Sequence, residues 1–566
     1  MRLTDDALAA AREVVLTEAA AASVPEVAFG IISDGQVVAG QGCDRIYRIA
    51  SMTKSFTAAT VLGLCRGLIP AVGRRPDLDD LLADWLPALS TGQWAEEITV
   101  RDALTMATGL PKDDPWADRL ESMPISQLQR LMQSPALTNF PAGGGFEYAN
   151  YGYAMLGAFV EAVTGRAFTD VVHLHLIAPL GLESTGFDVR RLDADRLVTG
   201  YRRTHDGDLE PQPISLPGAF SAIGGLASTV EDIAVWVAAL IESAQRREPG
   251  DACRALGRGD AEARAWRRVL ADLQQAQRPI SIAHARDHAV SVGYGYGLRC
   301  AFDTRYGHTA GHSGGYPGFS LHMRWHAATG AGIIVLANLT GFPAEEVATR
   351  ALHAALAELQ ATAPDAGLRP ASRPATQTPV QKAAAASEAV ATAEAEAVSA
   401  AATASDAETT SKAASASETA TAGRPVIYPV APIAGFEPTE LARTRQQQAE
   451  AMIASGDDRG AAAVFSANMD LDIPRSERLA AWARIRDHLG ARTSENQGAE
   501  GRGEPVVEWL TALSARWTVW AADGAEPRRG RRVEMMLNPA GEIQQLTVTA
   551  LPEDTAPAGR AESSNA

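Results

Sequence analysis

The first 40 residues change from a helical to a strand pattern of hydrophobic positions. Apolar residues recur with helical spacing over residues 4–22, and two short apolar runs, 27–32 and 36–39, follow. Asp34-Gly35 separates the two runs, and Asp-Gly between apolar runs is a strong hairpin signal. The pattern therefore predicts an N-terminal helix followed by two antiparallel strands.

The same two patterns return near residue 360 in the opposite order. Residues 332–338 form a continuous apolar run that suits a buried strand, and residues 344–360 return to helical spacing. Helical material lies between the two end segments. We therefore expect an α+β fold in which one antiparallel sheet, built from both ends of this region, is flanked by helices and carries an inserted helical subdomain.

Composition divides the chain into three parts and a tail. Residues 1–360 mix helix and strand patterns, whereas residues 361–425 are mainly Ala, Ser, Thr, Glu and Pro with almost no large apolar side chains. Such a stretch cannot bury enough surface to offset its conformational entropy, so we expect a disordered low-complexity linker. Aromatic and aliphatic residues return over 426–552, and the polar tail 553–566 is expected to be disordered.

The segment 426–552 has the pattern of a small α+β domain. Helical spacing covers roughly residues 438–455 and 458–467, and apolar residues alternate with polar ones further on. Residues 538–541, Asn-Pro-Ala-Gly, predict a hairpin turn between the last two strands. The segment weakly resembles small domains that accompany bacterial hydrolases, which implies an accessory, ligand-binding or oligomerisation role.

Net charge and cysteine content narrow the possible functions. A formal charge of −17 leaves no basic surplus to neutralise phosphate, so we expect no nucleic-acid partner. The four cysteines are scattered and form no Cys-x-x-Cys pair, which indicates reduced, structural thiols.

The N-terminal segment does not have the pattern of an export signal. Asp5 and Asp6 follow Arg2 closely, and Glu13 and Glu18 interrupt the first apolar stretch. The sequence contains no run of about 18 apolar residues of the kind that spans a membrane. We therefore expect a cytoplasmic protein with no membrane partner.

Lysine is rare in this chain, and one lysine has a chemically suggestive position. Of the 51 basic residues only four are lysines, and Lys54 comes three residues after Ser51, at the start of a helical run. A buried lysine can give up its proton and an arginine cannot, so a lysine one helical turn from a hydroxyl suits an activated serine nucleophile. Taken alone, Ser-x-x-Lys also arises by chance, and a serine at a helix start is most often a cap.

Two later motifs give the serine its context. Ser51-Met52-Thr53-Lys54 is followed by Tyr148-Ala149-Asn150 and then by His312-Ser313-Gly314. In this order they resemble the Ser-x-x-Lys, Tyr-x-Asn and His-x-Gly motifs of the beta-lactamase-like serine hydrolases, a superfamily of class C β-lactamases, D,D-peptidases, D-aminopeptidases and esterases. The resemblance covers about residues 10–357 and implies the β-lactamase/transpeptidase-like fold.

The resemblance implies a role for each motif. Ser51 is the nucleophile that accepts the acyl group, and Lys54 and Tyr148 form the base. Free Lys and Tyr both titrate near pH 10 and each influences the other, so which of them takes the serine proton stays open. Asn150 is expected to hydrogen-bond the substrate and to hold Lys54.

The third motif is expected to line the substrate site. The backbone N–H groups of Ser51 and Gly315 form the expected oxyanion hole, and Ser313 and Gly314 are expected to contact substrate. His312 stands where much of the family has lysine. A neutral imidazole can still donate a hydrogen bond, but it does not guarantee a positive charge.

Three further residues are candidates for ligand contacts. Trp116 follows a turn that borders the active-site mouth in this fold, so it either lines the pocket or is a buried residue of a solvated loop. His284 and His288 have zinc-like spacing, but no third ligand or nearby Glu completes a site, so we expect no metal. No phosphate-binding glycine motif occurs, and we expect no cofactor.

The leading interpretation is a serine hydrolase that forms an acyl-enzyme at Ser51 on a small ester, amide or short peptide. A carboxylesterase, or an amidase or peptidase for D-amino-acid substrates, fits His312 and the missing export signal. One alternative is a β-lactamase or a D,D-peptidase-like, penicillin-interacting enzyme. Another is an inactive binding scaffold whose C-terminal domain binds a ligand. The oligomeric state stays open.

Overall fold

The computed structural model of the chain divides into two compact units. The first unit contains Met1–Arg75, Thr169–Ile214 and Gly224–Ala431, and the second contains the remaining segments. The structure describes residues 2–89, 97–112, 117–134, 136–204, 207–245, 248–284, 288–362, 426–429, 438–456, 458–466, 469, 475–488, 507–520 and 530–551. The expected linker, 361–425, therefore lies almost entirely outside the described residues.

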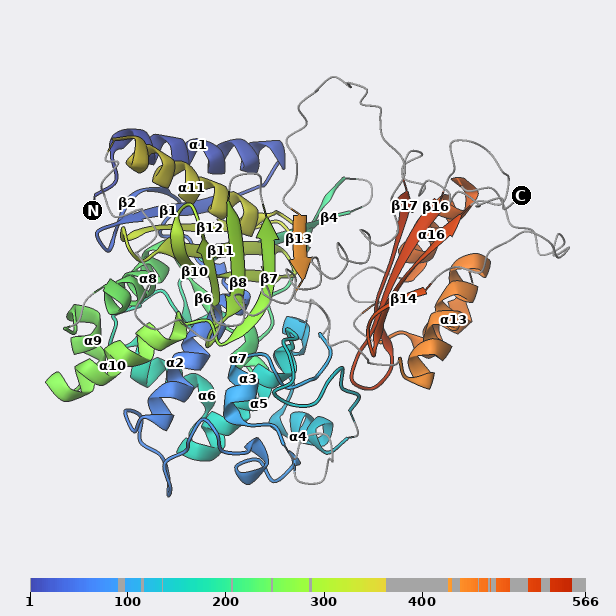
Figure 1. The fold of residues 1–566 in the computed structure, drawn as a ribbon, viewed down its shortest axis with the longest axis horizontal. Coiled ribbons are helices and arrows are strands. Elements are labelled where there is room, and N and C mark those ends of the chain that lie inside the picture. Colours follow the sequence, from blue (N-terminus) through green and yellow to red (C-terminus); the bar gives the residue numbers. More distant parts are fainter. Residues whose placement is uncertain are drawn as a thin grey trace, which may run out of the picture. The chain divides into compact units, whose positions relative to one another are not determined.

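A nine-stranded antiparallel sheet forms the centre of the first unit, with the strand order β13-β7-β8-β9-β10-β11-β12-β1-β2 (Figure 1). Its strands are β1 (Val27–Ser33), β2 (Gln36–Gln41), β7 (Arg278–His284), β8 (Ala289–Tyr294), β9 (Arg299–Asp303), β10 (Gly307–Tyr316), β11 (Phe319–His326), β12 (Ala331–Ala337) and β13 (Val426–Pro429). Because β1 pairs with β12, the prediction of one sheet made from both ends of the region is confirmed.

The turn between β1 and β2 has the conformation that its sequence predicts. Asp34 and Gly35 both have positive φ, 49° and 77°. A two-residue turn of this kind matches the right-handed twist of the strands it joins, and Asp-Gly adopts it readily. The predicted hairpin is therefore confirmed, and it forms one edge of the sheet.

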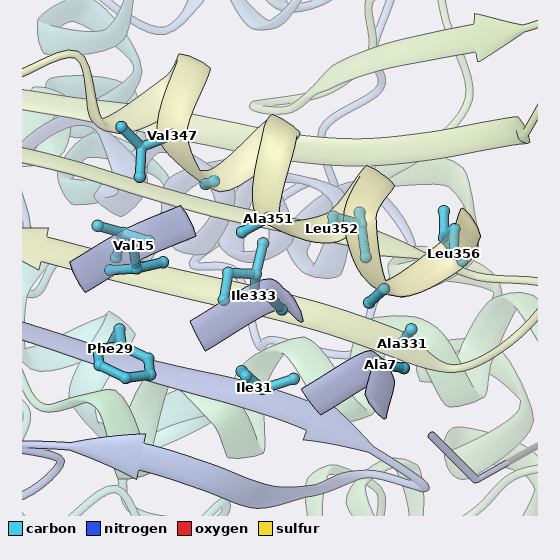
Figure 2. Close-up of a cluster of buried hydrophobic side chains, with 14 of the residues drawn as sticks. Ala7, Val15, Phe29, Ile31, Ala331, Ile333, Val347, Ala351, Leu352 and Leu356 are labelled. Atoms are coloured by element: carbon cyan, nitrogen blue, oxygen red, sulfur yellow. The ribbon is translucent and has the colours of Figure 1, made fainter. Parts of the chain in front are cut away.

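Two long helices, α1 (Asp5–Ala21) and α11 (Ala344–Thr362), cover one face of the sheet (Figure 1). Small residues repeat along the buried stripe of α1, which lets it approach the sheet and α11 closely. Figure 2 shows Val15, Phe29, Ile333 and Leu352 from four different elements in this cluster. The Thr4 hydroxyl caps α1 by accepting a hydrogen bond from the Ala7 amide, 3.2 Å away.

The opposite face of the sheet carries the helices that surround the serine motif. Gly30 lies between Phe29 and Ile31 in β1 and therefore faces the other way, toward Val230. The helices on this side are α2 (Thr53–Cys65), α8 (Val230–Gln245), α9 (Asp251–Leu256) and α10 (Asp260–Leu273). All of α2 except its last residue is buried, so the helix after Ser51 runs through the interior of the unit.

Shorter elements complete the first unit. They are β3 (Tyr47–Arg48), η1 (Ala50–Met52), α6 (Phe168–Val172), η6 (His173–Ile177), η7 (Val189–Arg191), β4 (Gly200–Arg203), β5 (Leu209–Gln212), α7 (Ser221–Gly224) and β6 (Ala227–Ser228), of which α6 and α7 begin in the second unit. The residues 426–429, expected to open the C-terminal domain, instead pair with β7 as an edge strand of this sheet.

The second unit contains the inserted helical segment. Its elements are η2 (Leu82–Asp84), α3 (Val100–Leu104), η5 (Ala117–Leu120), α4 (Ile125–Gln133) and α5 (Asn150–Thr164). A capping box between Thr99 and Asp102 starts α3, and Gly165 ends α5 in the left-handed conformation. The hydroxyl of Tyr153 on α5 donates to the carbonyl of Leu104, 2.9 Å away, and ties the two helices together.

The same unit contains the small C-terminal α+β domain. A four-stranded sheet, β14-β15-β16-β17, packs with helices against one core. The elements are α13 (Glu440–Ser455), α14 (Asp458–Val464), α16 (Arg475–His488), β14 (Val507–Thr511), β15 (Ser514–Trp520), β16 (Gly530–Leu537) and β17 (Ile543–Leu551). The predicted hairpin between β16 and β17 is confirmed, and within this unit its Pro539 carbonyl accepts a hydrogen bond from the Leu137 amide, 2.9 Å away.

A helix that crosses a bilayer needs about 20 predominantly apolar residues. Among the described residues, no helix combines the length and the apolar character needed to cross a membrane.

Candidate active site

Ser51 lies in the 3₁₀ turn η1, which leads directly into α2. The amine Nζ of Lys54 donates to the hydroxyl oxygen Oγ of Ser51 at 2.8 Å. Lys54 is fully buried, whereas Ser51 is partly exposed. A hydroxyl that is partly exposed is therefore in direct contact with an amine that is shielded from water.

The backbone around Ser51 is held by the segment that contains β6. Ala50 has a positive φ of 48°, which is unfavourable for a residue with a side chain. The Ile49 amide donates to the Leu226 carbonyl at 2.9 Å, and the Leu226 amide donates to the Thr53 hydroxyl at 3.1 Å. These bonds on both sides of Ser51 hold the strained turn in place.

The first turn of α2 is fixed by an aromatic contact with α8. Trp236 donates from its indole N–H to the Ser55 hydroxyl at 3.0 Å. Its ring stacks on Phe56 with 4.3 Å between the ring centres. Because Ser55 and Phe56 are the two residues after Lys54, the contact anchors the helix backbone beside the lysine.

Strand β10, which carries the third motif, lies beside the serine turn. A side chain at Gly314 would collide with the carbonyl oxygen of Ile49, so this close approach requires glycine. Gly297 makes a similar approach to the Lys54 carbonyl and has a φ of 72°. At Gly315, by contrast, the described residues other than its two chain neighbours place no atom within 4 Å of where a Cβ would be, so its backbone borders open space.

His312 is held in one neutral form by two hydrogen bonds. Burial, helped by the charge of Lys54, lowers the pKa of His312 to about 3. Its Nδ1 lies 2.6 Å from the Ser313 carbonyl oxygen, which can only accept, so Nδ1 carries the proton. Its Nε2 must then accept the hydrogen bond from the Tyr294 hydroxyl, 3.2 Å away.

This geometry limits the hydrogen bonds that the His312 side chain can offer to a substrate. A neutral imidazole has one N–H, and here that N–H is used by the backbone of the neighbouring residue. In this arrangement His312 has no second N–H for a substrate, and its role in the site stays a prediction. Tyr294, at the end of β8, is its direct partner, and no local motif pointed to it.

Ser313 points to the opposite face of the sheet from His312. Its hydroxyl donates to the carboxylate of Glu345 on α11 at 2.8 Å and lies 2.9 Å from Nδ1 of His322. Adjacent residues of a strand alternate between faces, and α11 covers the face away from α2. A contact of Ser313 with substrate stays a prediction, and it would have to involve the backbone.

Tyr148 and Asn150 lie in the second unit, at the start of α5. Asn150 is 7% exposed, and its Oδ1 is without a hydrogen-bond partner among the residues that the structure describes. Tyr148 is partly exposed, whereas Tyr151 and Tyr153 are packed in the interior. The approach of Tyr148 and Asn150 to Ser51 stays a prediction.

The segment before Tyr148 is tied to the loop that contains Lys112. The amide of Lys112 donates to the Glu147 carboxylate at 3.2 Å, and the amide of Glu147 donates to the Met106 carbonyl at 2.9 Å. Burial raises the pKa of Glu147. Trp116, the expected pocket residue of this loop, lies outside the described residues.

The candidate metal ligands do not form a site in the described residues. His284 ends the strand β7, so the helical spacing to His288 does not apply. His288 instead lies 3.8 Å from Asp303. Within the described ranges, no group of three His, Cys, Asp or Glu side chains has the arrangement of a metal site.

A family model identifies the domain that contains this site. The Beta-lactamase family model matches residues 11–358, which include all three motifs. The chain belongs to the beta-lactamase family. The motifs of Ser51, Tyr148 and His312 are therefore those of a beta-lactamase-family domain, and proteins with this fold are generally serine hydrolases.

Curated relatives of this beta-lactamase-family chain are distant. It is similar to Protein flp of Staphylococcus aureus (strain MW2), with 23% identity over 360 residues, 60% of this chain and 64% of that protein. It therefore spans a little less than two thirds of that relative's length. A second relative is the unguisins hydrolase ungD' of Aspergillus campestris, 27% identical over 215 residues, which are 36% of this chain and 39% of that protein.

A solved structure supports the beta-lactamase-like fold. The octameric penicillin-binding protein homologue from Pyrococcus abyssi superposes with a TM-score of 0.51 and 24% identity, covering 62% of this chain and 78% of that chain. At this identity the likeness establishes the fold only.

Proposed function

We propose that this protein is a serine hydrolase that cleaves small esters or amides through an acyl-enzyme at Ser51. The observation that carries the proposal is the 2.8 Å hydrogen bond between Lys54 Nζ and the partly exposed Ser51 Oγ, with Lys54 fully buried. A hydroxyl becomes a strong nucleophile when a base beside it takes its proton during attack.

The reaction has two balanced steps. In the first, Ser51 Oγ attacks the acyl carbon, its proton passes to the base formed by Lys54 and Tyr148, and the leaving alcohol or amine departs with a proton. In the second, water attacks the new ester, the acid is released, and Ser51 regains its proton. The backbone N–H groups of Ser51 and Gly315 bind the developing oxyanion in both steps.

The environment of His312 favours substrates without a carboxylate beside the reacting carbonyl. With a pKa lowered to about 3 by burial, the ring is neutral at physiological pH, and its N–H is used by the Ser313 carbonyl. Burying a carboxylate without a positive partner or a donor is costly. An ester or amide without such a carboxylate, including a D-amino-acid amide or a short peptide cleaved away from its C-terminus, suits the site better than a penicillin.

Asn150 supplies a polar contact that suits an amide. Its buried Oδ1, without a partner among the described residues, is an acceptor that a substrate N–H or the Lys54 amine can satisfy. Leaving such an oxygen unpaired costs about 1–3 kcal/mol, so a ligand that donates to it gains a corresponding preference.

The substrate class can be tested with three chromogenic substrates. We expect p-nitrophenyl butyrate and D-alanine p-nitroanilide to be hydrolysed, and Ser51→Ala to abolish both activities. Nitrocefin, which carries the carboxylate of a β-lactam, should have a much lower kcat/KM. A nitrocefin kcat/KM above that of the ester would instead favour the β-lactamase alternative.

A further inference from the structure

Four polar residues form a connected cluster on the face of the sheet opposite the serine turn. Ser313 on β10 pairs in register with His322 on β11, and Arg324 lies two residues further along the same strand. Residues two apart share a face, so all three side chains point toward α11. There the carboxylate of Glu345, in the first turn of α11, completes the cluster.

Hydrogen-bond chemistry fixes the direction of each link in this cluster. Arg324 can only donate, and its Nε lies 3.2 Å from Nε2 of His322, so this ring nitrogen carries no proton. Burial and the charge of Arg324 hold the pKa of His322 well below its usual value, so the ring is neutral. Its one proton is therefore on Nδ1, which donates to Ser313 Oγ at 2.9 Å.

The remaining two bonds close a ring. Ser313 has one hydroxyl proton, which it donates to Glu345 Oε2 at 2.8 Å. The other carboxylate oxygen, Oε1, accepts from the terminal nitrogen NH2 of Arg324 at 3.2 Å. The hydrogen bonds run from Arg324 to His322, then to Ser313 and then to Glu345, and the bond from Arg324 to Glu345 closes the ring. Each polar atom in the ring has the partner that its chemistry requires.

The charge of the ring is stable over a wide pH range. Burial alone would raise the pKa of Glu345. The pKa is instead lowered to about 2 by the surrounding basic groups, Arg324 among them, and by the hydrogen bond from Ser313. The position of Glu345 at the N-terminus of α11 also favours the ionised carboxylate. The ring is thus intact wherever the protein is folded near neutral pH.

Ser313 connects this ring to the candidate active site. Its side chain is held by Glu345 and His322, and its backbone carbonyl accepts the proton of His312 at 2.6 Å. The next residues of β10 pass close to Ile49 and reach the open space at Gly315. Any shift of Ser313 along the strand would therefore move both His312 and the Gly315 N–H.

We propose that Arg324 and Glu345 are positioning residues of the hydrolytic reaction, which through Ser313 fix the part of β10 that presents His312 and Gly315 to the acyl group. Neither side chain touches the substrate, because both lie across the sheet from Ser51. The inference rests on the proposed function. An oxyanion donor is effective only within a few tenths of an ångström of its ideal position, so a small strand displacement lowers the rate.

The test uses the full-length protein and its Glu345→Ala and Ser313→Ala variants, singly and combined. We measure kcat and KM for p-nitrophenyl butyrate and the rate at which a fluorophosphonate labels Ser51. Each single variant should lower kcat by about tenfold with KM nearly unchanged, because the displaced donor acts mainly in the transition state. The double variant should lose about the same tenfold, because both changes break one ring.

Two variants separate positioning from general stability. Glu345→Gln keeps an oxygen that can accept from Ser313, so it should recover part of the lost kcat. Glu346→Ala removes the exposed neighbouring carboxylate on the same turn and should leave kcat unchanged. Single variants with lower melting temperature but normal kcat, or losses that multiply to about a hundredfold in the double variant, would overturn the inference.

The inference and the proposed function fail in different ways. If the unmodified protein is not labelled at all, the proposed function is wrong. The ring can then be tested by NMR, with protein in which the histidine ring nitrogens are labelled with ¹⁵N. The signals of His322 are identified by their loss in His322→Gln, and their chemical shifts show which ring nitrogen carries the proton. A proton on Nδ1 of His322 supports the ring, and a proton on Nε2 contradicts it.

Discussion

Lys54 and Ser51 lie one helical turn apart, and the lysine amine is 2.8 Å from the serine hydroxyl oxygen. The lysine is fully buried in α2, and the serine is in the strained turn before it. The pair thus joins a partly exposed hydroxyl, a buried amine and a constrained backbone, an arrangement that suits the nucleophilic catalysis that we propose.

The first prediction concerns the ability of Lys54 to lose a proton. Lys54→Arg keeps a positive charge but cannot act as a base, so we expect the rate of Ser51 acylation to fall by about a hundredfold or more. The measurement is the second-order rate of fluorophosphonate labelling by intact mass. Lys112→Arg, in a loop of the second unit, is the matched control for replacing a lysine. A labelling rate for Lys54→Arg within a few-fold of the unmodified protein would show that Lys54 is not the base.

The second prediction concerns the charge at position 312. His312→Lys introduces an ammonium that can bind a carboxylate, and a charge-assisted hydrogen bond contributes about 1.5–3 kcal/mol. We therefore expect the rate of Ser51 acylation by benzylpenicillin to rise by about tenfold or more relative to that of p-nitrophenyl butyrate. His312→Gln, which adds no charge, should not change this ratio. An unchanged ratio in His312→Lys would mean that position 312 does not control the selection of carboxylates.

The sequence predicted the motif residues of this site better than the residues that hold those motifs in place. The spacing of Ser51 and Lys54 implied their contact because residues three apart share a helix face. The alternation of a strand also carries a usable signal: His312 and Ser313 are adjacent, so they cannot both face Ser51. Tyr294 and Glu345 could not be predicted, because they reach β10 from another strand and a helix without any local motif.

The fold shows the same division between local and distant signals. The N-terminal hairpin and the strand before α11 follow from turn chemistry and apolar runs, and both were predicted. The strands β7 to β9 were not predicted, although each pairs with the next strand along the chain, because none of them contains a continuous apolar run like that of residues 332–338. The pairing of 426–429 with β7 likewise has no signal in its own sequence.

The third prediction compares two tyrosines of the second unit. Tyr148→Phe removes the hydroxyl assigned to the base, so kcat should fall by about a hundredfold with little change in melting temperature. Tyr153→Phe removes a buried hydroxyl that donates to Leu104, so it should lower the free energy of unfolding by about 1 kcal/mol and leave kcat unchanged. The opposite pattern, with kcat lost only in Tyr153→Phe, would contradict the role of Tyr148.

The fourth prediction is a dependence of stability on pH. Burial lowers the pKa of His312 to about 3 and that of His326 to about 4, whereas both titrate near 6.5 in an unfolded chain. The unfolded state therefore binds more protons between these values, and stability is lost as the pH falls from about 6.5 toward 3. The melting temperature should be highest above pH 6.5 and fall below it. In His326→Gln the fall between pH 6.5 and 4 should be shallower, and an unchanged slope would count against this cause.

The central claim is that Ser51 is the nucleophile of a hydrolase, and intact mass after incubation with a fluorophosphonate tests it most directly. We predict one adduct on the unmodified protein and none on Ser51→Ala. A parallel incubation with benzylpenicillin should leave no lasting adduct, in agreement with a preference for neutral substrates. A protein that stays unlabelled by the fluorophosphonate, or a Ser51→Ala variant that is still labelled, would contradict the claim.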